Sequence, residues 1–298
     1  MKIVTVATHN ERYYPYLKAS AKRNGYDLVT LGWNEKWRGF TWKFQVMRDY
    51  LKTLPDDEIV CFVDGYDVIL LQEERILENT FRKIVGNDKN KIVVSSEVQP
   101  DNSVDKFIQV SWCSFFSYKC KNAFLNSGTY ITYSSTLFDI YSNLCNIYTC
   151  KDDSDDQILL QQYCNRYPDN FILDTDCDIF LVMPSLMGPL KPNTNNISIN
   201  DGILSYKNKT PCVLHAPAYT DIDDILDELK YDSTLFRARN EDKSEYRYKF
   251  IKHFLKELFN RYKYIIFTIL IVLFTYLVFG DKIVKIFKKV FRPSKNRR

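Results

Sequence analysis

A buried strand that ends in two carboxylates is the feature that most constrains the fold. Residues 59–63, Ile-Val-Cys-Phe-Val, have the continuous apolar character of a strand covered on both faces. Asp64 follows at once and Asp67 three positions later. Ligands of open α/β sheets bind at the carboxyl ends of strands, and neighbouring carboxylates repel each other unless a cation joins them. Oxygen ligands favour Mg²⁺ or Mn²⁺ over zinc. We therefore predict a divalent-cation site here; the alternative is a solvated turn, because Asp and Gly are common turn residues.

Strand and helix patterns alternate over the first part of the chain. We predict strands at residues 3–6, 28–31, 59–63 and 91–95. We predict helices at residues 11–24, 43–54 and 73–85. This order predicts an α/β fold with a largely parallel, doubly wound central sheet.

The pattern is less regular after residue 97. Helices are expected at residues 135–147, 158–167 and 221–230. Strands are expected at residues 129–133, 171–174, 197–206 and 211–215, with two of the short strands in a hairpin. Residues 124–128, Phe-Leu-Asn-Ser-Gly, are interpreted as a polar turn between apolar runs.

Charge and cysteine content exclude some functions. The net charge is +4, but much of the positive excess follows residue 280, and no stripe of basic and aromatic residues indicates nucleic-acid binding. The eight cysteines contain no Cys-x-x-Cys pair and no histidine spacing that suits zinc. The N-terminus is typical of a first strand rather than a signal peptide, so we expect the cysteines to be free buried thiols.

The C-terminal part predicts attachment to a membrane. Residues 264–280 carry no charge, although their length is at the lower limit for crossing a bilayer. A basic amphipathic pattern follows at residues 281–298. We predict a globular domain at 1–230, a charged linker and juxtamembrane helix at 231–262, a single transmembrane helix at 263–280 and a basic tail. The globular domain is expected in the cytosol, anchored through the C-terminal helix.

Three further groups of residues are candidates for a functional site, but each also has a simpler structural explanation. Four acids and a glutamine at residues 152–157 open a helix, where capping explains one or two of the acids. His215 follows an apolar strand, a place where a hydrogen-bonded core histidine is more common than a metal ligand. Trp33, Trp37 and Trp42 lie close to Lys43 and suit either stacking on a nucleobase or packing.

The order of these motifs resembles the glycosyltransferase domain of the procollagen lysyl hydroxylases and its stand-alone relatives in large DNA viruses. The motifs that carry the resemblance are Thr5–Thr8, Leu31–Gly32 with Glu35–Trp37, Asp64–Val68, Ser95–Glu97, Phe124–Gly128, Asp155–Gln157, Leu173–Asp174 with Cys177, and Val213–His215. The family's Gly-Asn-Gly after the histidine is replaced here by Ala216-Pro217-Ala218, and the Trp of its Trp-Pro-Asp by Gln99.

The resemblance implies a GT-A-type, Rossmann-like glycosyltransferase fold that binds a UDP-sugar with Mn²⁺ or Mg²⁺. The implied metal ligands are Asp64, Asp67 and His215. The residues implied to contact the donor nucleotide are Thr8, Trp37, Lys43, Asp64, Tyr66 and Glu97. The residues implied to face the reacting sugar and the acceptor are Asn126, Asp155, Asp156 and Gln157.

The implied reaction moves glucose or galactose from UDP-glucose or UDP-galactose to an acceptor hydroxyl. That acceptor is a glycan or a protein side chain, such as hydroxylysine or galactosyl-hydroxylysine of a collagen-like protein. The alternative is a membrane-tethered nucleotide-sugar-binding or scaffold protein whose active site is degenerate.

Overall fold

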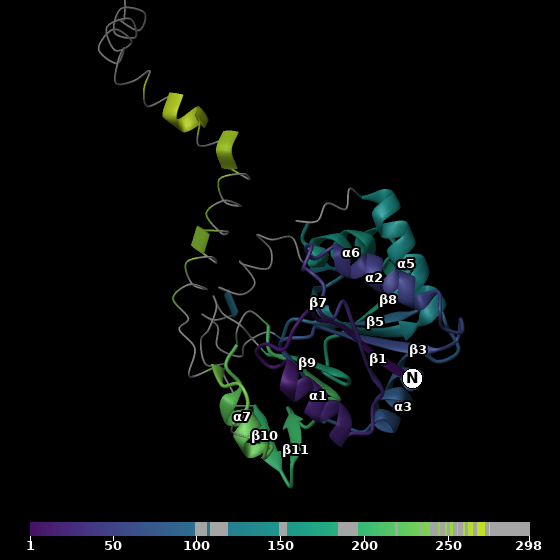
Figure 1. Cartoon of the computed structure of the whole chain (residues 1–298). Coiled ribbons are helices and arrows are strands. Elements are labelled where there is room, and N and C mark those ends of the chain that lie inside the picture. Colours follow the sequence, from purple (N-terminus) through teal and green to yellow (C-terminus); the bar gives the residue numbers. More distant parts are fainter. Residues whose placement is uncertain are drawn as a thin grey trace, which may run out of the picture. The chain divides into compact units, whose positions relative to one another are not determined.

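The computed structural model describes residues 1–98, 106–107, 119–148, 154–183, 196–217, 220–232 and 234–238, with scattered residues between 244 and 274. The chain divides into two compact units, Met1–Glu241 and Asp242–Arg298. Figure 1 shows the first unit as a sheet with helices on its faces. Within the described residues no helix has both the length and the apolar character needed to cross a membrane. The predicted anchor lies largely, and the predicted tail wholly, outside the described residues.

The central sheet mixes parallel and antiparallel strands. Along it lie β2 (Leu28–Leu31), β1 (Lys2–Val6), β3 (Ile59–Val63), β7 (Ala123–Tyr133), β5 (Ile92–Ser96) and β8 (Phe171–Asp174), while β6 (Lys119–Cys120) pairs with β7 beside this path. β1 is parallel to β2 and β3, and β5 is parallel to β8, but β7 runs antiparallel to both of its neighbours in the path. The predicted α/β class and the largely parallel sheet are confirmed for this path, because every strand in it except β7 runs in the same direction. The prediction missed that β7 enters the centre in the opposite direction.

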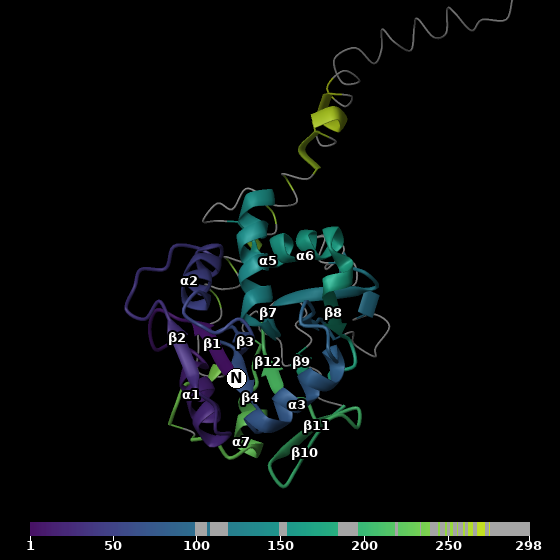
Figure 2. The same ribbon diagram turned by 90° about the vertical axis from the view of Figure 1, so that its right-hand side faces the viewer.

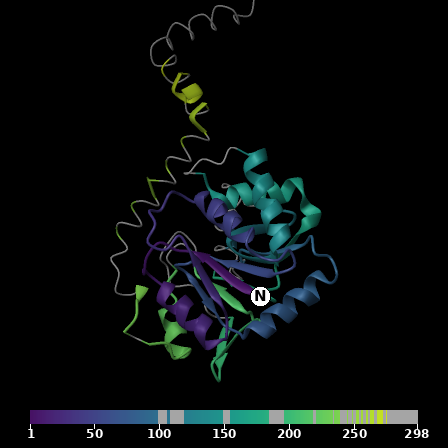
Figure 3. The ribbon, with the colours of Figure 1, turned by 45° about the vertical axis from the view of Figure 1, so that its right-hand side comes forward.

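Helices cover both faces of the sheet, because its strands send alternate apolar side chains to opposite sides. The helices are α1 (Tyr14–Arg23), α2 (Trp42–Leu51), α3 (Glu74–Val85), α5 (Ser134–Ile147) and α6 (Asp156–Arg166). One apolar core joins α2, α5 and α6 to one face, and a second joins α1 and α3 to the other. Figures 1 and 3 show this division.

A smaller sheet positions the late histidine. It consists of β4 (Val68–Leu70), β12 (Val213–His215) and β9 (Phe180–Val182). β12 runs antiparallel to β4, with His215 opposite Val68, and the Ala216 N–H donates to the Asp67 carbonyl oxygen over 2.8 Å. This pairing joins residues that are far apart in the sequence. β4 and β9 were absent from the predicted elements, because each is too short for its pattern to be distinctive.

The region predicted as one strand at 197–206 is itself a hairpin, formed by β10 (Ile197–Asn200) and β11 (Ile203–Tyr206). Asp201 and Gly202 form its turn with φ values of 51° and 78°, the left-handed conformation that two-residue hairpins favour. Figure 2 shows this hairpin at the opposite end of the unit from α5 and α6.

The chain stays packed against the first unit beyond residue 230. The short helix α7 (Asp223–Glu228) is followed by Tyr231 and Ala238, both buried in the same apolar cluster as Tyr16. Arg237 donates to the Asp227 carboxylate over 3.0 Å and to the Tyr16 hydroxyl. These contacts hold the segment after α7 on the domain.

The predicted turn at residues 124–128 is wrong, because these residues belong to β7. Asn126 and Ser127 are almost completely buried there. Their polar side chains made the segment look like a turn, but in the structure those side chains bond to neighbouring site residues instead of water.

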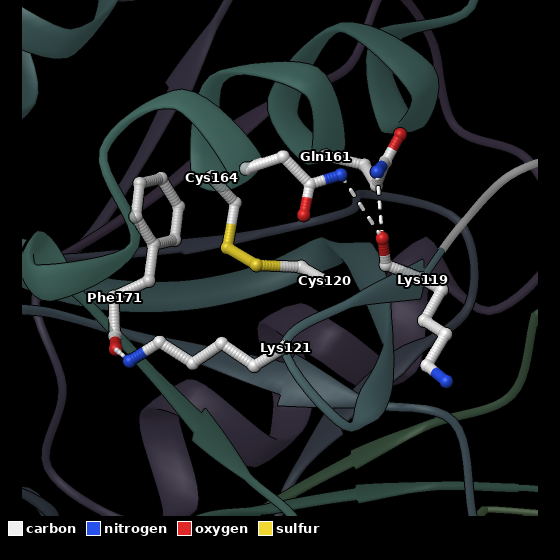
Figure 4. Close-up of a disulfide and its surroundings, with 7 residues drawn as sticks. Lys119, Cys120, Lys121, Gln161, Cys164 and Phe171 are labelled. Atoms are coloured by element: carbon white, nitrogen blue, oxygen red, sulfur yellow. Dashed lines mark hydrogen bonds between the residues drawn. A yellow bond between two sulfur atoms is a disulfide. The ribbon is translucent and has the colours of Figure 1, made fainter.

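The expectation that the cysteines are free thiols is wrong for part of the set. Cys120 of β6 and Cys164 of α6 form a disulfide (Figure 4), and Cys145 is disulfide-bonded too. Cys61, Cys177 and Cys212 are free and buried, as expected. The Cys120–Cys164 pair spans 44 positions in the sequence, so its two members meet only once α6 packs beside β6.

Candidate metal and donor site

Two carboxylates and an imidazole converge where the two sheets meet. Asp64 follows β3, Asp67 precedes β4 and His215 ends β12. One candidate ligand atom from each residue lies within 4.8 Å of the others. His215 Nε2 is 3.5 Å from Asp67 Oδ1. The sequence pattern placed the two acids at a strand end, and the β4–β12 pairing adds the histidine.

The donor atoms of this trio fit a divalent cation. Within the described part of the chain, Asp67 Oδ1 and both ring nitrogens of His215 are buried and have no hydrogen-bond partner. Buried polar atoms nearly always have partners, so several such atoms facing one point indicate a ligand that they share. Two carboxylates and one neutral imidazole are ligands that divalent cations accept in proteins.

Burial and charge move the pKa values of the trio in different directions. Burial raises the pKa of Asp64 to about 6, against the effect of the Lys43 ammonium. Burial also acts on Asp67, but nearby His215 and Arg12 hold the pKa of that carboxyl below its usual value. Burial disfavours the charged imidazole, yet Asp67 and Asp64 together raise the pKa of His215. Around pH 6 the metal-free site therefore retains protons that a cation must displace.

We expect Mn²⁺ affinity to rise with pH. A metal binds the deprotonated carboxylate and the neutral imidazole, so the proton on Asp64 competes with it below about pH 6. The raised pKa of His215 extends this competition to higher pH. Calorimetric titration with Mn²⁺ at about pH 5 and about pH 7.5 should give roughly tenfold weaker binding or worse at the lower pH. Equal affinities at the two values would contradict the assignment of these residues as ligands.

Gly128 of β7 lies directly against the imidazole. A Cβ atom at position 128 would lie 2.2 Å from His215 Cε1 and 2.8 Å from Nε2. Only a residue without a side chain leaves room for the ring there. β7 thus limits where the His215 ring can lie.

A buried lysine connects the trio to α6. Lys43 in the first turn of α2 is 5% exposed, and its Nζ lies 3.0 Å from Asp64 Oδ1 and 2.7 Å from Asp156 Oδ2. Asp155 caps α6 by accepting from the Ile158 N–H over 3.1 Å. The predicted capping role is therefore confirmed for one acid of the cluster, while Asp156 joins the site. Asp152 and Asp153 lie outside the described residues.

Ser127 joins α6 to β7. Its N–H donates to Gln157 Oε1 over 3.3 Å, and its hydroxyl lies 3.4 Å from Asp156 Oδ2. Next to it, Asn126 donates to Glu97 Oε1 over 2.8 Å and accepts from the Gly128 N–H over 2.9 Å. Burial raises the pKa of Glu97. These contacts connect the predicted acceptor-side residues to the metal trio.

The remaining predicted donor-side residues lie in the loops after β1 and β2. The Thr8 N–H donates to the Tyr66 hydroxyl over 2.9 Å, which ties the first loop to the Asp64–Asp67 turn. Trp37 is 39% exposed and packs edge-on against Phe40 and Trp42. The Phe40 ring lies 5.6 Å from Lys43 Nζ, so one contact of Trp37 leads to the site through this neighbour.

Sequence reasoning missed Arg12. Its side chain is almost completely buried, its φ is 50°, and its charge acts on Asp67. No pattern in the sequence marks it, because a single arginine before a helix is usually a surface residue. Ser127 was contained in a recognised motif, but its link to α6 depends on the strand that replaced the predicted turn.

Comparison with known proteins identifies the family to which the chain belongs. Residues 1–230 match the family model described as the PLOD GT domain. The chain belongs to the PLOD GT domain family. It is therefore a glycosyltransferase domain of the procollagen lysyl hydroxylase type, as the resemblance implied.

Curated relatives include proteins more than twice as long. The chain is 27% identical over 194 residues to procollagen-lysine,2-oxoglutarate 5-dioxygenase 1 of Rattus norvegicus, covering 60% of this chain and 25% of that protein. It is 29% identical over 171 residues to the human multifunctional procollagen lysine hydroxylase and glycosyltransferase LH3, covering 52% of this chain and 21% of that protein. The chain thus spans about a quarter or less of the length of these relatives.

Solved structures similar to the chain are also glycosyltransferases. One is a glycosyltransferase involved in the glycosylation of the major capsid of PBCV-1, with 12% identity and a TM-score of 0.38, covering 59% of this chain and 84% of that chain. Another is the galactosyltransferase LgtC in complex with donor and acceptor sugar analogs, with 14% identity and a TM-score of 0.38, covering 72% of this chain and 86% of that chain.

Proposed function

We propose that this PLOD GT domain protein has a GT-A-type fold and transfers a hexose from a UDP-sugar to an acceptor hydroxyl, with Mn²⁺ as its metal. The observation that carries the proposal is the group of buried ligand atoms on Asp67 and His215 that make no hydrogen bond and lie beside Asp64. A cation held there would neutralise charge on the diphosphate of the donor and stabilise UDP as it leaves.

Lys43 and the loops around it suit the donor side of the reaction. Lys43 is buried, and burial of a charge is stable only when it is paired, as it is here with Asp64 and Asp156. The lysine therefore holds the metal-site carboxylate and the α6 carboxylate in fixed positions relative to each other. Tyr66 and Thr8, joined by their hydrogen bond, form the wall of the site that follows β1.

Asp155, Asp156 and Gln157 suit the reacting end of the sugar. Their turn joins Lys43 on one side and Ser127 on the other, so its position is fixed before substrate arrives. If the configuration at the sugar inverts, Asp155 or Asp156 takes the proton of the acceptor hydroxyl. If it is retained, these acids position the sugar and the leaving phosphate takes that proton. The anomer of the product decides between the two.

The proposed acceptor is a hydroxyl of a glycan or of a collagen-like protein side chain. The printed names of the relatives join procollagen lysine hydroxylation with glycosyl transfer, which supports hydroxylysine or its galactosylated form as the first acceptors to test. The donors to test first are UDP-glucose and UDP-galactose.

The full chain should release UDP from one preferred UDP-sugar in the presence of Mn²⁺. Removal of the metal with a chelator should lower the rate by at least about a thousandfold, because the metal supplies several kcal/mol of charge stabilisation. We would measure UDP release from a panel of UDP-sugars, with and without a hydroxylysine peptide and free sugars as acceptors. UDP binding without release under any condition would favour the binding or scaffold protein instead.

A further inference from the structure

The Cys120–Cys164 disulfide lies on the helix that carries the reacting acids. The first turn of α6 holds Asp156 and Gln157 at the site, and Cys164 lies farther along the same helix. Cys164 is eight positions after Asp156, which corresponds to about 12 Å along a helix axis. The bond is therefore outside the site but on the element that positions it.

Hydrogen bonds to β6 accompany the covalent bond. Gln161 Nε2 donates to the Lys119 carbonyl oxygen over 2.6 Å, and Asn165 Nδ2 donates to the same oxygen over 3.2 Å. Gln161, Cys164 and Asn165 are three and four positions apart and so share one face of α6. Figure 4 shows this face against β6, with the disulfide beside the hydrogen bonds.

β6 is in turn fixed to the strand that forms the site. It pairs with β7 at Ala123 and Phe124, just before Asn126, Ser127 and Gly128. In the turn between these strands, Lys121 donates to the Phe171 carbonyl oxygen of β8 over 2.7 Å. α6 is thus attached to the β6–β7 segment at two places: the first turn through Ser127, and the later turns through Lys119 and Cys120.

The apolar packing of α6 does not replace this attachment. Leu159, Leu160 and Tyr163 are buried in the core under the helix, but apolar contacts are non-directional and allow small shifts along or about the axis. A tilt of about 10° at Cys164 would move the first turn by about 2 Å, given the length of the helix between them. Misplacement by about 1 Å can lower a rate roughly a hundredfold.

We propose that the Cys120–Cys164 disulfide is a positioning element that holds the Asp156–Gln157 turn in register with the metal trio. This role rests on the proposed transfer reaction. Cys120 and Cys164 do not touch the reacting atoms; they act through α6. Because Asp64, Asp67 and His215 lie on other elements, loss of the bond should affect the acids of α6 and leave metal and nucleotide binding in place.

The test compares the full wild-type chain with Cys120→Ser, Cys164→Ser and the double variant. We expect kcat for transfer to fall by about tenfold or more, while UDP affinity in the presence of Mn²⁺ changes less than about twofold. Combining either substitution with Asp156→Asn should add little further loss of kcat, because both changes act on the same turn. Cys212→Ala is the matched control: it removes a buried free thiol from the other core and should leave kcat unchanged.

Amide hydrogen exchange provides a readout that does not depend on activity. Amides at 156–160 should exchange faster in both single variants than in wild type, with little change in β3 and β12. Variants that lose stability but keep the wild-type kcat and the wild-type exchange at 156–160 would overturn the proposal, as would free thiols at both positions in active protein. Faster exchange in variants of a protein that turns over no sugar donor would instead refute the proposed function and leave the positioning role standing.

Discussion

Replacing Asp64 with Asn should lower sugar transfer by at least about a thousandfold, because the loss of several kcal/mol of transition-state charge stabilisation costs a factor of ten for each 1.36 kcal/mol. Asn keeps the shape of the side chain but removes the charge that binds the cation. The fold should survive, because burial already opposes ionisation of Asp64 and Lys43 keeps its ion pair with Asp156.

UDP release with Mn²⁺ and thermal unfolding, measured on the same preparations, would check this result. Asp57→Asn is a suitable control, since Asp57 is an exposed acid before β3 and away from the trio. Turnover of the Asp64 variant close to that of wild type would refute the assignment of the metal site. A variant that fails to fold would show instead that Asp64 matters mainly through its pairing with Lys43.

Replacing Gly128 with Ala should abolish tight Mn²⁺ binding without changing any candidate ligand. The added methyl would lie 2.2 Å from His215 Cε1, so either the ring or β7 must move. β7 is paired with β3 at Thr129, and the Gly128 carbonyl oxygen accepts from the Asp64 N–H over 2.8 Å, so the imidazole is the group expected to move. A histidine displaced by even 1 Å no longer completes the trio, and we expect a loss of metal affinity of roughly a hundredfold.

Calorimetric titration with Mn²⁺ checks the Gly128 prediction directly. Thr129→Ser is the matched control, because Thr129 is the next residue of β7 and its side chain lies on the opposite face of the sheet. The control should bind Mn²⁺ as wild type does. Unchanged affinity in Gly128→Ala would mean that His215 does not hold the metal, whatever the effect of Asp64→Asn.

The parts of the site that the sequence predicted are those with a local signal. Asp64 and Asp67 stand out because they follow an apolar strand, and that signal needs no knowledge of distant residues. Asp155 stands out as the first acid of a helix, and the structure confirms its capping role. His215 had no comparable local signal; the resemblance to a family selected it, and the β4–β12 pairing places it beside Asp67.

The parts that the sequence did not predict depend on contacts between distant segments. Asn126 and Ser127 have turn-forming side chains, yet they continue β7 because Glu97, Asp156 and Gln157 satisfy their polar atoms. The antiparallel direction of β7 likewise depends on its pairing with β3 and β5, which are distant in the sequence. Hydrogen bonds between distant segments do not produce a periodic pattern in the sequence, and neither does the pairing of Cys120 with Cys164.

The family match and the compact unit end at different residues, because the segment after α7 packs on the domain. The family match ends at residue 230, whereas the compact unit extends to Glu241. Tyr16 donates its hydroxyl to the carbonyl oxygens of Asp232 and Phe236, over 3.1 and 2.9 Å, so the first turn of α1 contacts residues outside the match. A fragment cut where the homology ends would expose Tyr16 and leave α1 without these acceptors. The smallest fragment that keeps α1, and with it the Thr8 loop, in place is therefore longer than the evolutionary unit.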